Sequence, residues 1–577
     1  MRYLLIIVFS FLFTSLFAQE KRGVLLTPFE QDDNHTATYE EAIVFYKKLA
    51  KMSSFVQMVK EGQTDSGEPL YSVVISDQPI LNRSTATANN KVVLLVNNAI
   101  HAGEPCGVDA SMMLARELAT THKSLLEETV VVIIPFYNVG GVLNRNSYTR
   151  ANQNGPESYG FRGNARNYDL NRDFIKCDTE NAKSFAQIYQ KWNPDVFVDN
   201  HTSNGADYPY TLTLIPTQSD KLPSSMKKYM DGQMLPSLFN AMKKTDWEMT
   251  PYVYARTTPD EGIAAFLDAP RYSSGYAALH FAYSFMPETH MLKTFSARVR
   301  STHAFMHALL THMKDNKSQI ILSRADALTE ILKSDSLSIN WALDQSKSDS
   351  LLFKGYTATT KKSKVTGMDR LFYDHEQPYE KNIPFYRYYQ ATKSVSIPKA
   401  YIIPQSYRHL VELMQLHGVK VETLTKDQTL DIEQYKIVDF KSSSSPYEGH
   451  YLHSNVSVEK YATKVIYKKG DFLISTAQDA IQYIVHVLEP QAKDSFFAWN
   501  FFDSILQQKE HFSAYVFEDL AWDLLQVDGE LKKLFEDKKG SDADFAKNPD
   551  AQLDFIYHLS PHYEKTHRVY PVGRVVE

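Results

Sequence analysis

The stretch KVVLLVNNAIHAGEPCGVD, residues 91–109, decides the fold of the first half of this chain. It opens with an unbroken apolar run, which is typical of a buried strand. The helical spacing of GVDASMMLARELATTH follows at 107–122, and a second apolar run, ETVVVIIPFYN, follows at 128–138. Strand, helix and strand in this order predict a βαβ crossover. We therefore expect an α/β fold in which a mixed sheet is flanked by helices.

The loop that leaves the first of these strands carries two side chains able to bind a metal. His101 and Glu104 stand three residues apart in HAGE. Open α/β sheets place their binding sites at the carboxyl ends of strands, where this loop lies. The same spacing recurs twice, at His409 with Glu412 and at His486 with Glu489. Both of those pairs fall within predicted helices, so we expect them to be structural.

A second histidine follows a different predicted strand. His201 comes directly after DVFVDN, residues 195–200. Two histidines and one carboxylate are a known catalytic zinc set, which leaves a fourth coordination position for water. The sequence therefore predicts one Zn²⁺ per chain, bound by His101, Glu104 and His201.

Glu288 lies in SFMPETH, residues 284–290, at the end of another apolar run. A carboxylate beside a metal can take the proton of a water molecule whose pKa the metal has already lowered. We expect Glu288 to be this base. The alternative is an exposed glutamate at a strand end.

Five arginines are spread over a loop-rich stretch that is also rich in Gly and Asn. They are Arg145, Arg150, Arg162, Arg166 and Arg172. Such a stretch can be a solvated face. However, Asn171 and Arg172 are adjacent in NYDLNRDF, and an amide next to a guanidinium suits bidentate binding of a substrate carboxylate.

Taken together, these motifs resemble a known family. They are HAGE, NVGG, YTR, DLNR, NH and PETH, in this order within roughly residues 35–315. Their order and residue types are similar to those of the zinc carboxypeptidases, the carboxypeptidase A-like family. The resemblance implies that His101, Glu104 and His201 bind zinc and that Glu288 activates water.

The resemblance also implies roles for residues of the loop. Arg150 matches the arginine that stabilises the oxyanion, with Arg145 and Arg162 near enough to leave the assignment open. Asn171 and Arg172 match the pair that holds the terminal carboxylate of the substrate. Asp169 is expected either to accept a hydrogen bond from a ligand histidine or to cap the loop.

The chain departs from the family pattern at three points. Gly103 stands where digestive members carry an arginine. The mobile tyrosine of the family has two possible counterparts, Tyr272 and Tyr276. His290, two residues beyond Glu288, has no assigned role, and a structural one is favoured.

The length and the first residues predict several parts. At 577 residues the chain exceeds the roughly 250–300 residues at which a single core stops growing. MRYLLIIVFSFLFTSLFA, residues 1–18, is typical of a secretory signal peptide, since its apolar run is shorter than the roughly 20 residues that span a bilayer. We expect a catalytic domain over 19–315, a helical and irregular connector over 316–395, and an α+β accessory region over 396–577.

Composition narrows the partners. The net charge is −6 and no long basic block is present, so nucleic acid is an improbable partner. We expect a secreted or periplasmic protein with no membrane span after signal removal. The two cysteines, Cys106 and Cys177, could pair or stay separate, because a sequence does not give their distance. The oligomeric state is not indicated.

The expected activity is hydrolysis of an amide bond next to a free carboxylate. The expected substrates are peptides or peptidoglycan stem peptides. One alternative is an aspartoacylase-like deacylase of N-acyl amino acids, whose family also combines a metal loop of this type with DLNR. Another is a zinc-dependent binding protein without turnover.

Overall fold

The computed structural model describes residues 24–576, so the predicted signal peptide lies outside the described residues. The chain divides into two compact units. The N-terminal unit runs to Ile397 and also contains Arg408–Val421 and Ile474–Ser495. The C-terminal unit contains Pro398–Tyr407, Glu422–Leu473 and the chain from Phe496 onward.

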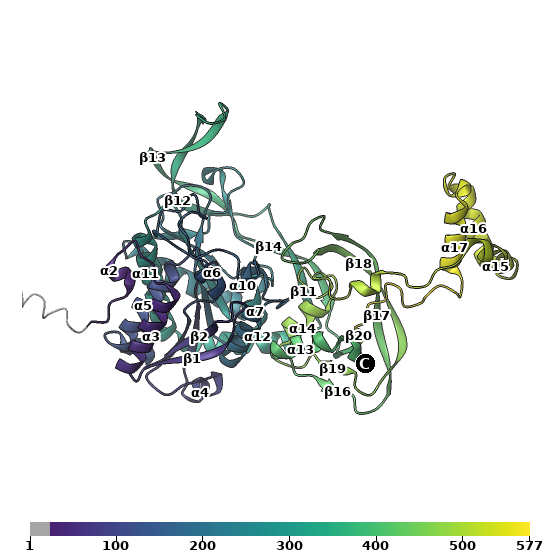
Figure 1. The fold of residues 1–577 in the computed structure, drawn as a ribbon, viewed down its shortest axis with the longest axis horizontal. Helices are drawn as coiled ribbons and strands as arrows, with labels where there is room; N and C mark the ends of the chain where they lie inside the picture. The colour runs from purple at the N-terminus through teal and green to yellow at the C-terminus, as the bar shows by residue number, and fades with distance from the viewer. Residues whose placement is uncertain (1–23, 577) are drawn as a thin grey trace, which may run out of the picture. The chain divides into compact units, whose positions relative to one another are not determined.

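The N-terminal unit is built on a nine-stranded mixed sheet (Figure 1). In spatial order its strands are β1 (Val56–Gln63), β2 (Pro69–Ile75), β4 (Thr129–Ile134), β3 (Val92–Asn97), β5 (Val196–Asp199), β10 (Tyr283–His290), β7 (Leu212–Pro216) and β8 (Met249–Pro251), while the short β6 (His201–Ser203) pairs with β10. Strands β4, β3, β5 and β10 run parallel. The predicted mixed sheet and its βαβ crossover are confirmed.

Helices cover both faces of this sheet, which is why its central strands are apolar throughout. Every residue of β3 and β4 is buried. Helices α3 (Tyr39–Met52), α5 (Cys106–Ala119) and α11 (Phe295–Asp315) lie together on one side, and α7 (Glu180–Trp192), α10 (Ser273–Leu279) and α12 (Lys317–Leu332) lie on the other (Figure 1). The apolar run that ends in SFMPETH belongs to β10, which follows α10.

The N-terminal unit continues beyond residue 315, where the sequence suggested an end. Helix α12 is fixed to the sheet by Arg324, whose guanidinium forms an ion pair with the buried carboxylate of Asp195. Arg83 pairs with the other oxygen of the same carboxylate. Burial raises the pKa of Asp195, but these two arginines outweigh it and hold the pKa below its ordinary value.

Two later segments also belong to the N-terminal unit. They contain α13 (Arg408–Leu416) and α14 (Ile481–Leu488). His417, just after α13, is hydrogen-bonded through Nδ1 to the Tyr276 hydroxyl at 2.8 Å. Arg271 donates a hydrogen bond to Asp494, which follows α14, at 2.7 Å. These buried polar contacts tie both segments to the neighbourhood of α10.

The stretch over 316–395, expected to be a helical and irregular connector, contains strands after α12. They are β11 (Ser336–Leu343), β12 (Asp349–Lys362), β13 (Asp369–Tyr386) and β14 (Tyr389–Ser396). Strands β12 and β13 form a long hairpin, and β13 pairs with the short β9 (Ile263–Ala264). The run KGYTATTKK at the end of β12 is polar, and most of that strand is exposed at least in part.

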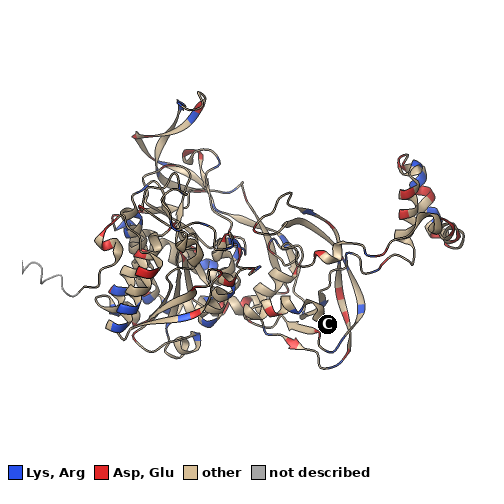
Figure 2. Ribbon diagram, viewed as in Figure 1, with Lys and Arg blue, Asp and Glu red and all other residues tan. Residues whose placement is uncertain are grey.

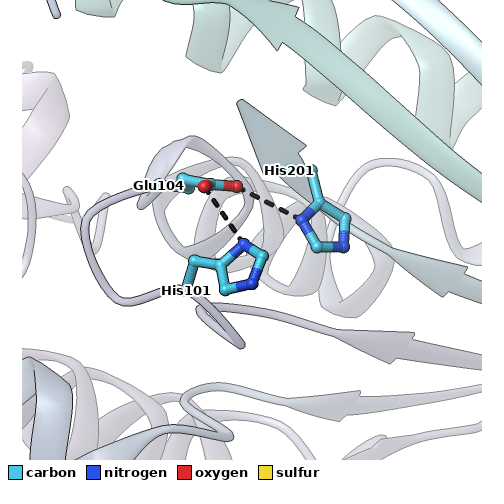
Figure 3. A group of neighbouring side chains, drawn as sticks. All are labelled: His101, Glu104 and His201. Atoms are coloured by element: carbon cyan, nitrogen blue, oxygen red, sulfur yellow. Dashed lines mark hydrogen bonds and ion pairs between the residues drawn. The ribbon is translucent and has the colours of Figure 1, made fainter. Parts of the chain in front are cut away.

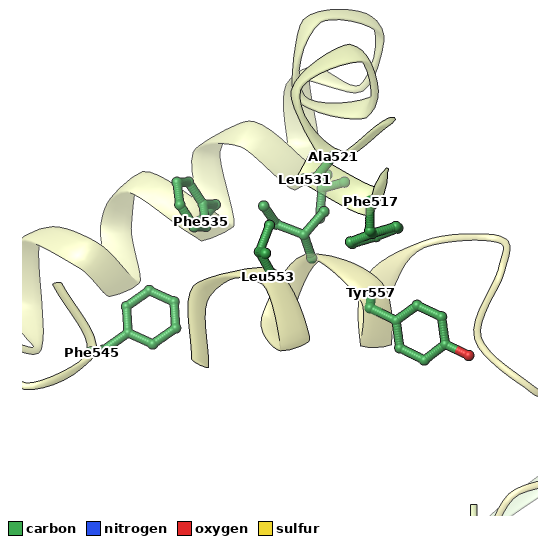
Figure 4. Close-up of a cluster of buried hydrophobic side chains, with 8 residues drawn as sticks. Phe517, Ala521, Leu531, Phe535, Phe545, Leu553 and Tyr557 are labelled. Atoms are coloured by element: carbon green, nitrogen blue, oxygen red, sulfur yellow. The ribbon is translucent and has the colours of Figure 1, made fainter. Parts of the chain in front are cut away.

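The C-terminal unit contains a second sheet and a small helical cluster. The sheet has the order β16 (Glu422–Thr423), β19 (Phe472–Ser475), β15 (Ala400–Ile403), β20 (Gly573–Val575), β17 (Gln428–Ser442) and β18 (His453–Tyr467). Helices α15 (Ala514–Val527), α16 (Gly529–Ser541) and α17 (Pro549–Leu559) pack through a core that includes Phe517, Phe535 and Leu553 (Figure 4). This agrees with an additional α+β region.

Three further observations concern the whole described chain. Lys and Arg residues are interspersed with Asp and Glu along the elements (Figure 2). Within residues 24–576, no helix is both long enough and apolar enough to cross a membrane. Cys106 and Cys177 are both buried and free, so they do not form the disulfide that the sequence left open.

We predict that Arg324→Met destabilises the N-terminal unit by about 3 kcal/mol, the lower end for a broken buried ion pair, because Arg83 still faces Asp195. Urea denaturation followed by circular dichroism measures the change. The matched control is Lys183→Met, which removes an exposed pair with Glu180 and should cost less than about 0.5 kcal/mol. Equal denaturation midpoints for the two variants would contradict the anchoring role of Arg324.

Candidate metal centre and active site

The carboxyl ends of three strands bring the predicted site residues together. His101 follows β3, His201 opens β6, and Glu288 lies near the end of β10. In the pairing of β6 with β10, Glu288 is the register partner of His201. Glu104 lies just before α5, which begins at Cys106. His101 and Glu288 are almost 200 positions apart in the sequence, but they reach one site because the strands that carry or precede them lie in the same part of the sheet.

Glu104 is the centre of the group, as Figure 3 shows. Its Oε1 lies 3.1 Å from Nδ1 of His101, and its Oε2 lies 3.2 Å from Nδ1 of His201. One potential ligand atom from each of the three residues lies within 4.8 Å of the others. All three side chains are buried, with Glu104 only 3% exposed.

Each histidine is oriented by an aspartate on its other nitrogen. Nε2 of His101 lies 3.0 Å from Asp169 Oδ1, and Nε2 of His201 lies 2.9 Å from Asp199 Oδ2. Such partners fix the ring and direct the remaining nitrogen toward a metal. Nδ1 of both rings therefore faces Glu104.

The group fits a zinc ion on the evidence of its own atoms. Nδ1 of His101 is buried and makes no hydrogen bond of acceptable geometry, although it lies near Glu104. Burial disfavours a charged His201, but Asp199 and Glu104 raise its pKa well above the ordinary value. A pocket that attracts a proton this strongly also attracts a divalent cation, and two imidazoles with a carboxylate are typical zinc ligands. The predicted cofactor, Zn²⁺, suits this site.

Glu288 faces the same cavity and has a perturbed pKa. Burial is the main cause, and the neighbouring Glu104 carboxylate adds to it, while His201 acts in the opposite direction. Together they raise the pKa of Glu288 to about 7. Carboxyl groups tuned toward neutral pH are suited to receive and release a proton.

The cavity has a volume of about 650 Å³ and is lined by three of the five loop arginines, Arg150, Arg162 and Arg172. Arg150 donates to Glu104 Oε1 at 2.7 Å, and Arg162 approaches the same oxygen at 3.6 Å. The other two point elsewhere. Arg145 binds Thr36 O and Ser158 Oγ, and Arg166 binds Asp178 O.

Asn171 and Arg172 lie together on the cavity wall, as the sequence predicts. Asn171 is 5% exposed, and its side-chain oxygen accepts a hydrogen bond from Ser273 N at 3.1 Å, which directs its amide group. The Arg172 guanidinium lies 4.5 Å from the ring of Tyr272, which also lines the cavity. An amide and a stacked guanidinium form a site for an anion.

Gly103 is required by the position of Arg150. A Cβ at residue 103 would lie 2.4 Å from Nε of Arg150 and 3.0 Å from the carbonyl oxygen of Gly160. The Arg150 side chain therefore fills the space that a side chain at 103 would need. This accounts for the glycine where the digestive members carry an arginine.

The remaining sequence alternatives are resolved by contacts. Of the two expected counterparts of the mobile tyrosine, Tyr276 is fully buried against His417, whereas Tyr272 lines the cavity. His290 is buried, lies 2.8 Å from Ala206 O and accepts from Leu292 N, which is a structural role. The other two His–Glu pairs are apart from this cavity, on α13 and at the end of α14.

Sequence reasoning missed several residues of the site. One of them is Asp199. In an extended chain, residues two apart point to the same face, so its place two residues before His201 could have indicated it. Gln153 donates to Gly103 O at 2.9 Å and borders the cavity. The apolar part of the wall is formed by Ile215, Tyr252, Phe266 and Met286. No sequence motif marks these four.

A mixed α/β sheet with a His, Glu, His cluster and a carboxylate at its carboxyl edge is the arrangement expected of a zinc-dependent hydrolase. Comparison with known families agrees, because the sequence model described as zinc carboxypeptidase matches residues 43–289. Residues 43–289 are thus similar to the zinc carboxypeptidases, and the protein is a metallopeptidase.

Related proteins include fungal enzymes. Carboxypeptidase 2 of Trichophyton tonsurans is 22% identical over 473 residues, covering 78% of this chain and 81% of the relative. Carboxypeptidase 2 of Trichophyton rubrum is 20% identical over 474 residues, with the same coverage. A solved metallo-carboxypeptidase from Burkholderia cenocepacia is 18% identical with a TM-score of 0.37, covering 48% of this chain and 70% of that one.

We predict that Asp169→Ala weakens zinc binding by about 10- to 100-fold, because the His101 ring loses the partner that orients it. Competition with a chromogenic chelator measures the affinity. Asp77→Ala, which removes a carboxylate paired with Lys91, is the control and should leave zinc binding unchanged. A wild-type zinc affinity in Asp169→Ala would show that the aspartate only caps its loop.

Proposed function

We propose that this metallocarboxypeptidase removes the C-terminal residue of peptides, with His101, Glu104 and His201 as zinc ligands and Glu288 as the base. The observation that carries the proposal is the placement of Glu288 beside His201 on the adjoining strand, in the cavity that Glu104 also lines. When bound, zinc would polarise the scissile carbonyl and make water more acidic.

Glu288 would transfer a proton in two steps. Its carboxylate would first remove a proton as the water attacks the carbonyl carbon. The resulting carboxyl group would then pass this proton to the leaving amine. A pKa near neutral supports both steps, since the same group must accept and donate at one pH.

Arg150 would stabilise the oxygen that becomes negative. Its guanidinium is held over Gly103 and lies at the edge of the group, with Nη2 at Glu104 and Nη1 at Gln153. A charged donor that is already positioned loses little entropy when the oxyanion forms. Arg162 is the neighbouring candidate, but Asp169 already binds its Nε and Nη2.

Asn171 and Arg172 would hold the terminal carboxylate of the substrate. This places the scissile amide one residue inward, toward the metal ligands. The apolar wall that includes Ile215, Phe266 and Met286 would receive the side chain of the residue released. We therefore propose a preference for apolar C-terminal residues, because this wall presents no opposite charge to a basic or acidic side chain.

Peptides are favoured over the alternatives. An N-acyl amino acid would use the carboxylate pair and the metal but little more of a cavity of about 650 Å³. A pure binding protein would have no need of Glu288 at the metal group. Peptidoglycan stem peptides are one subclass of such peptides, and residues 1–18 are predicted from the sequence to direct export.

Glu288→Gln should retain zinc but lose activity, with kcat reduced by about 100-fold or more, because glutamine cannot take a proton. Metal content and peptide hydrolysis are measured on the same preparation. His201→Ala is the contrasting variant and should lose both properties. Substantial turnover by zinc-loaded Glu288→Gln would exclude the glutamate as the base.

Three substrates test the carboxylate site. They are a peptide with a free C-terminal carboxylate, the same peptide with a C-terminal amide, and an N-acylated single amino acid. We predict that the free acid is cleaved best and that Phe or Leu at its end is preferred over Lys or Glu. Arg172→Met should reduce kcat/KM for the free acid toward the value for the amide. Equal rates for acid and amide in the wild type would contradict anchoring by Asn171 and Arg172.

A further inference from the structure

A second group of metal-binding side chains lies where α5 ends beside α11. Glu117 is in the last turn of α5, and His122 follows that helix. His303 and His307 are on α11, one helical turn apart. None of these residues lines the catalytic cavity. In the sequence they form no recognised motif, because two ligands come from each of two distant segments.

The geometry of the group is that of converging ligands. Nε2 of His303 lies 2.9 Å and Nε2 of His307 lies 2.7 Å from the same oxygen, Glu117 Oε2. The ring centroids of His122 and His307 are 4.9 Å apart. One ligand atom each from Glu117, His122 and His307 lies within 4.8 Å of the others.

Two packed helices carry three of these side chains, Glu117, His303 and His307. Helices α5 and α11 pack against each other, and residues four apart on a helix project from the same face. Glu117, His303 and His307 are half-buried, with exposures of about one fifth. A site with this exposure is open to a metal in solution while its ligands are held in place.

We propose that Glu117, His122, His303 and His307 form a second metal site, which binds a divalent transition metal such as Zn²⁺. Three imidazoles and one carboxylate suit zinc, nickel or copper rather than calcium or magnesium, which prefer oxygen ligands. Glu117, His122 and His307 each offer one ligand atom within 4.8 Å of the others, and His303 is the fourth candidate because its Nε2 lies 2.9 Å from Glu117 Oε2. Four protein ligands would close a tetrahedral shell, as in structural zinc sites. The bound metal would link the end of α5 to α11.

The second site is separate from the catalytic one but shares a helix with it. Glu117 is eleven residues beyond Cys106, so the rise of about 1.5 Å per residue puts it roughly 16 Å from the start of α5. Glu104 lies just before that start. A metal bound at the far end of α5 would stabilise this helix, which follows Glu104, without contacting the substrate.

Nearby charges do not block the site. One neighbouring cation is Arg116, whose Nη2 lies 3.9 Å from Glu117 Oε1, whereas His303 and His307 both lie at the other oxygen, Oε2. Its Nη1 pairs with Glu30 and donates to Leu25 O. Thr121 hydroxyl lies 3.0 Å from Nδ1 of His122, which leaves Nε2 of that ring for a metal.

Equilibrium dialysis against buffered Zn²⁺, followed by metal analysis, tests the proposal. Wild-type protein should bind two zinc ions per chain. The double variant His303→Ala/His307→Ala should bind one and keep its peptidase activity. His201→Ala should also bind one, and zinc should raise its Tm, whereas zinc should not raise the Tm of the His201→Ala/His303→Ala/His307→Ala variant.

Two further variants protect the test against misfolding. His122→Ala changes an exposed loop residue and should weaken the second site by at least tenfold. His562→Ala removes an exposed histidine elsewhere and should change nothing. A wild-type protein that binds only one zinc, or a double variant that still binds two, would overturn the proposal. Neither result would bear on the catalytic site.

Discussion

The structure of the catalytic site depends on one buried carboxylate, that of Glu104. Removing an ionised carboxylate from water is costly unless cations surround it. Burial raises the pKa of Glu104, but the nearby His101 and then Arg150, together with a hydrogen bond from His201, lower it well below the ordinary value. The group is thus preorganised around negative charge before any metal binds. Zinc would complete an arrangement that these side chains already form.

The sheet supplies this arrangement through the direction of its strands. Parallel strands β3, β5 and β10 end at one edge, so the segments that follow them lie side by side. Asp199 in β5 and Asp169 in the arginine-rich loop then fix the two histidine rings. Because each ligand has its own support, substitutions outside the three ligands are expected to affect metal binding.

Much of this site could be predicted from the sequence, because its residues follow apolar runs whose ends are visible. His101, Glu104, His201, Glu288, Asn171 and Arg172 all line one cavity in the structure. Asp199 and the apolar wall could not be predicted, since they depend on which face of a strand meets which neighbour. It could also not be predicted that α13 and α14, which come late in the sequence, belong to the N-terminal unit. Their apolar periodicity shows that they are buried but not against which partner.

The hairpin of β12 and β13 illustrates a different limit. Its residues are mostly polar and exposed, so no buried face produces a clear alternation, and the stretch read as irregular. Its anchor is a small core of Tyr208, Tyr210, Ile263, Phe353 and Ile383, drawn from distant segments. Here long-range packing, rather than local pattern, determines the strand.

The central claim is that His101, Glu104 and His201 hold one zinc ion beneath Glu288. Anomalous diffraction at the zinc edge from crystals of the metal-loaded protein tests it most directly. The account predicts a zinc peak about 2.0–2.2 Å from a nitrogen of each histidine and an oxygen of Glu104. A catalytic cavity without such a peak, or a peak that does not contact His201, would contradict it.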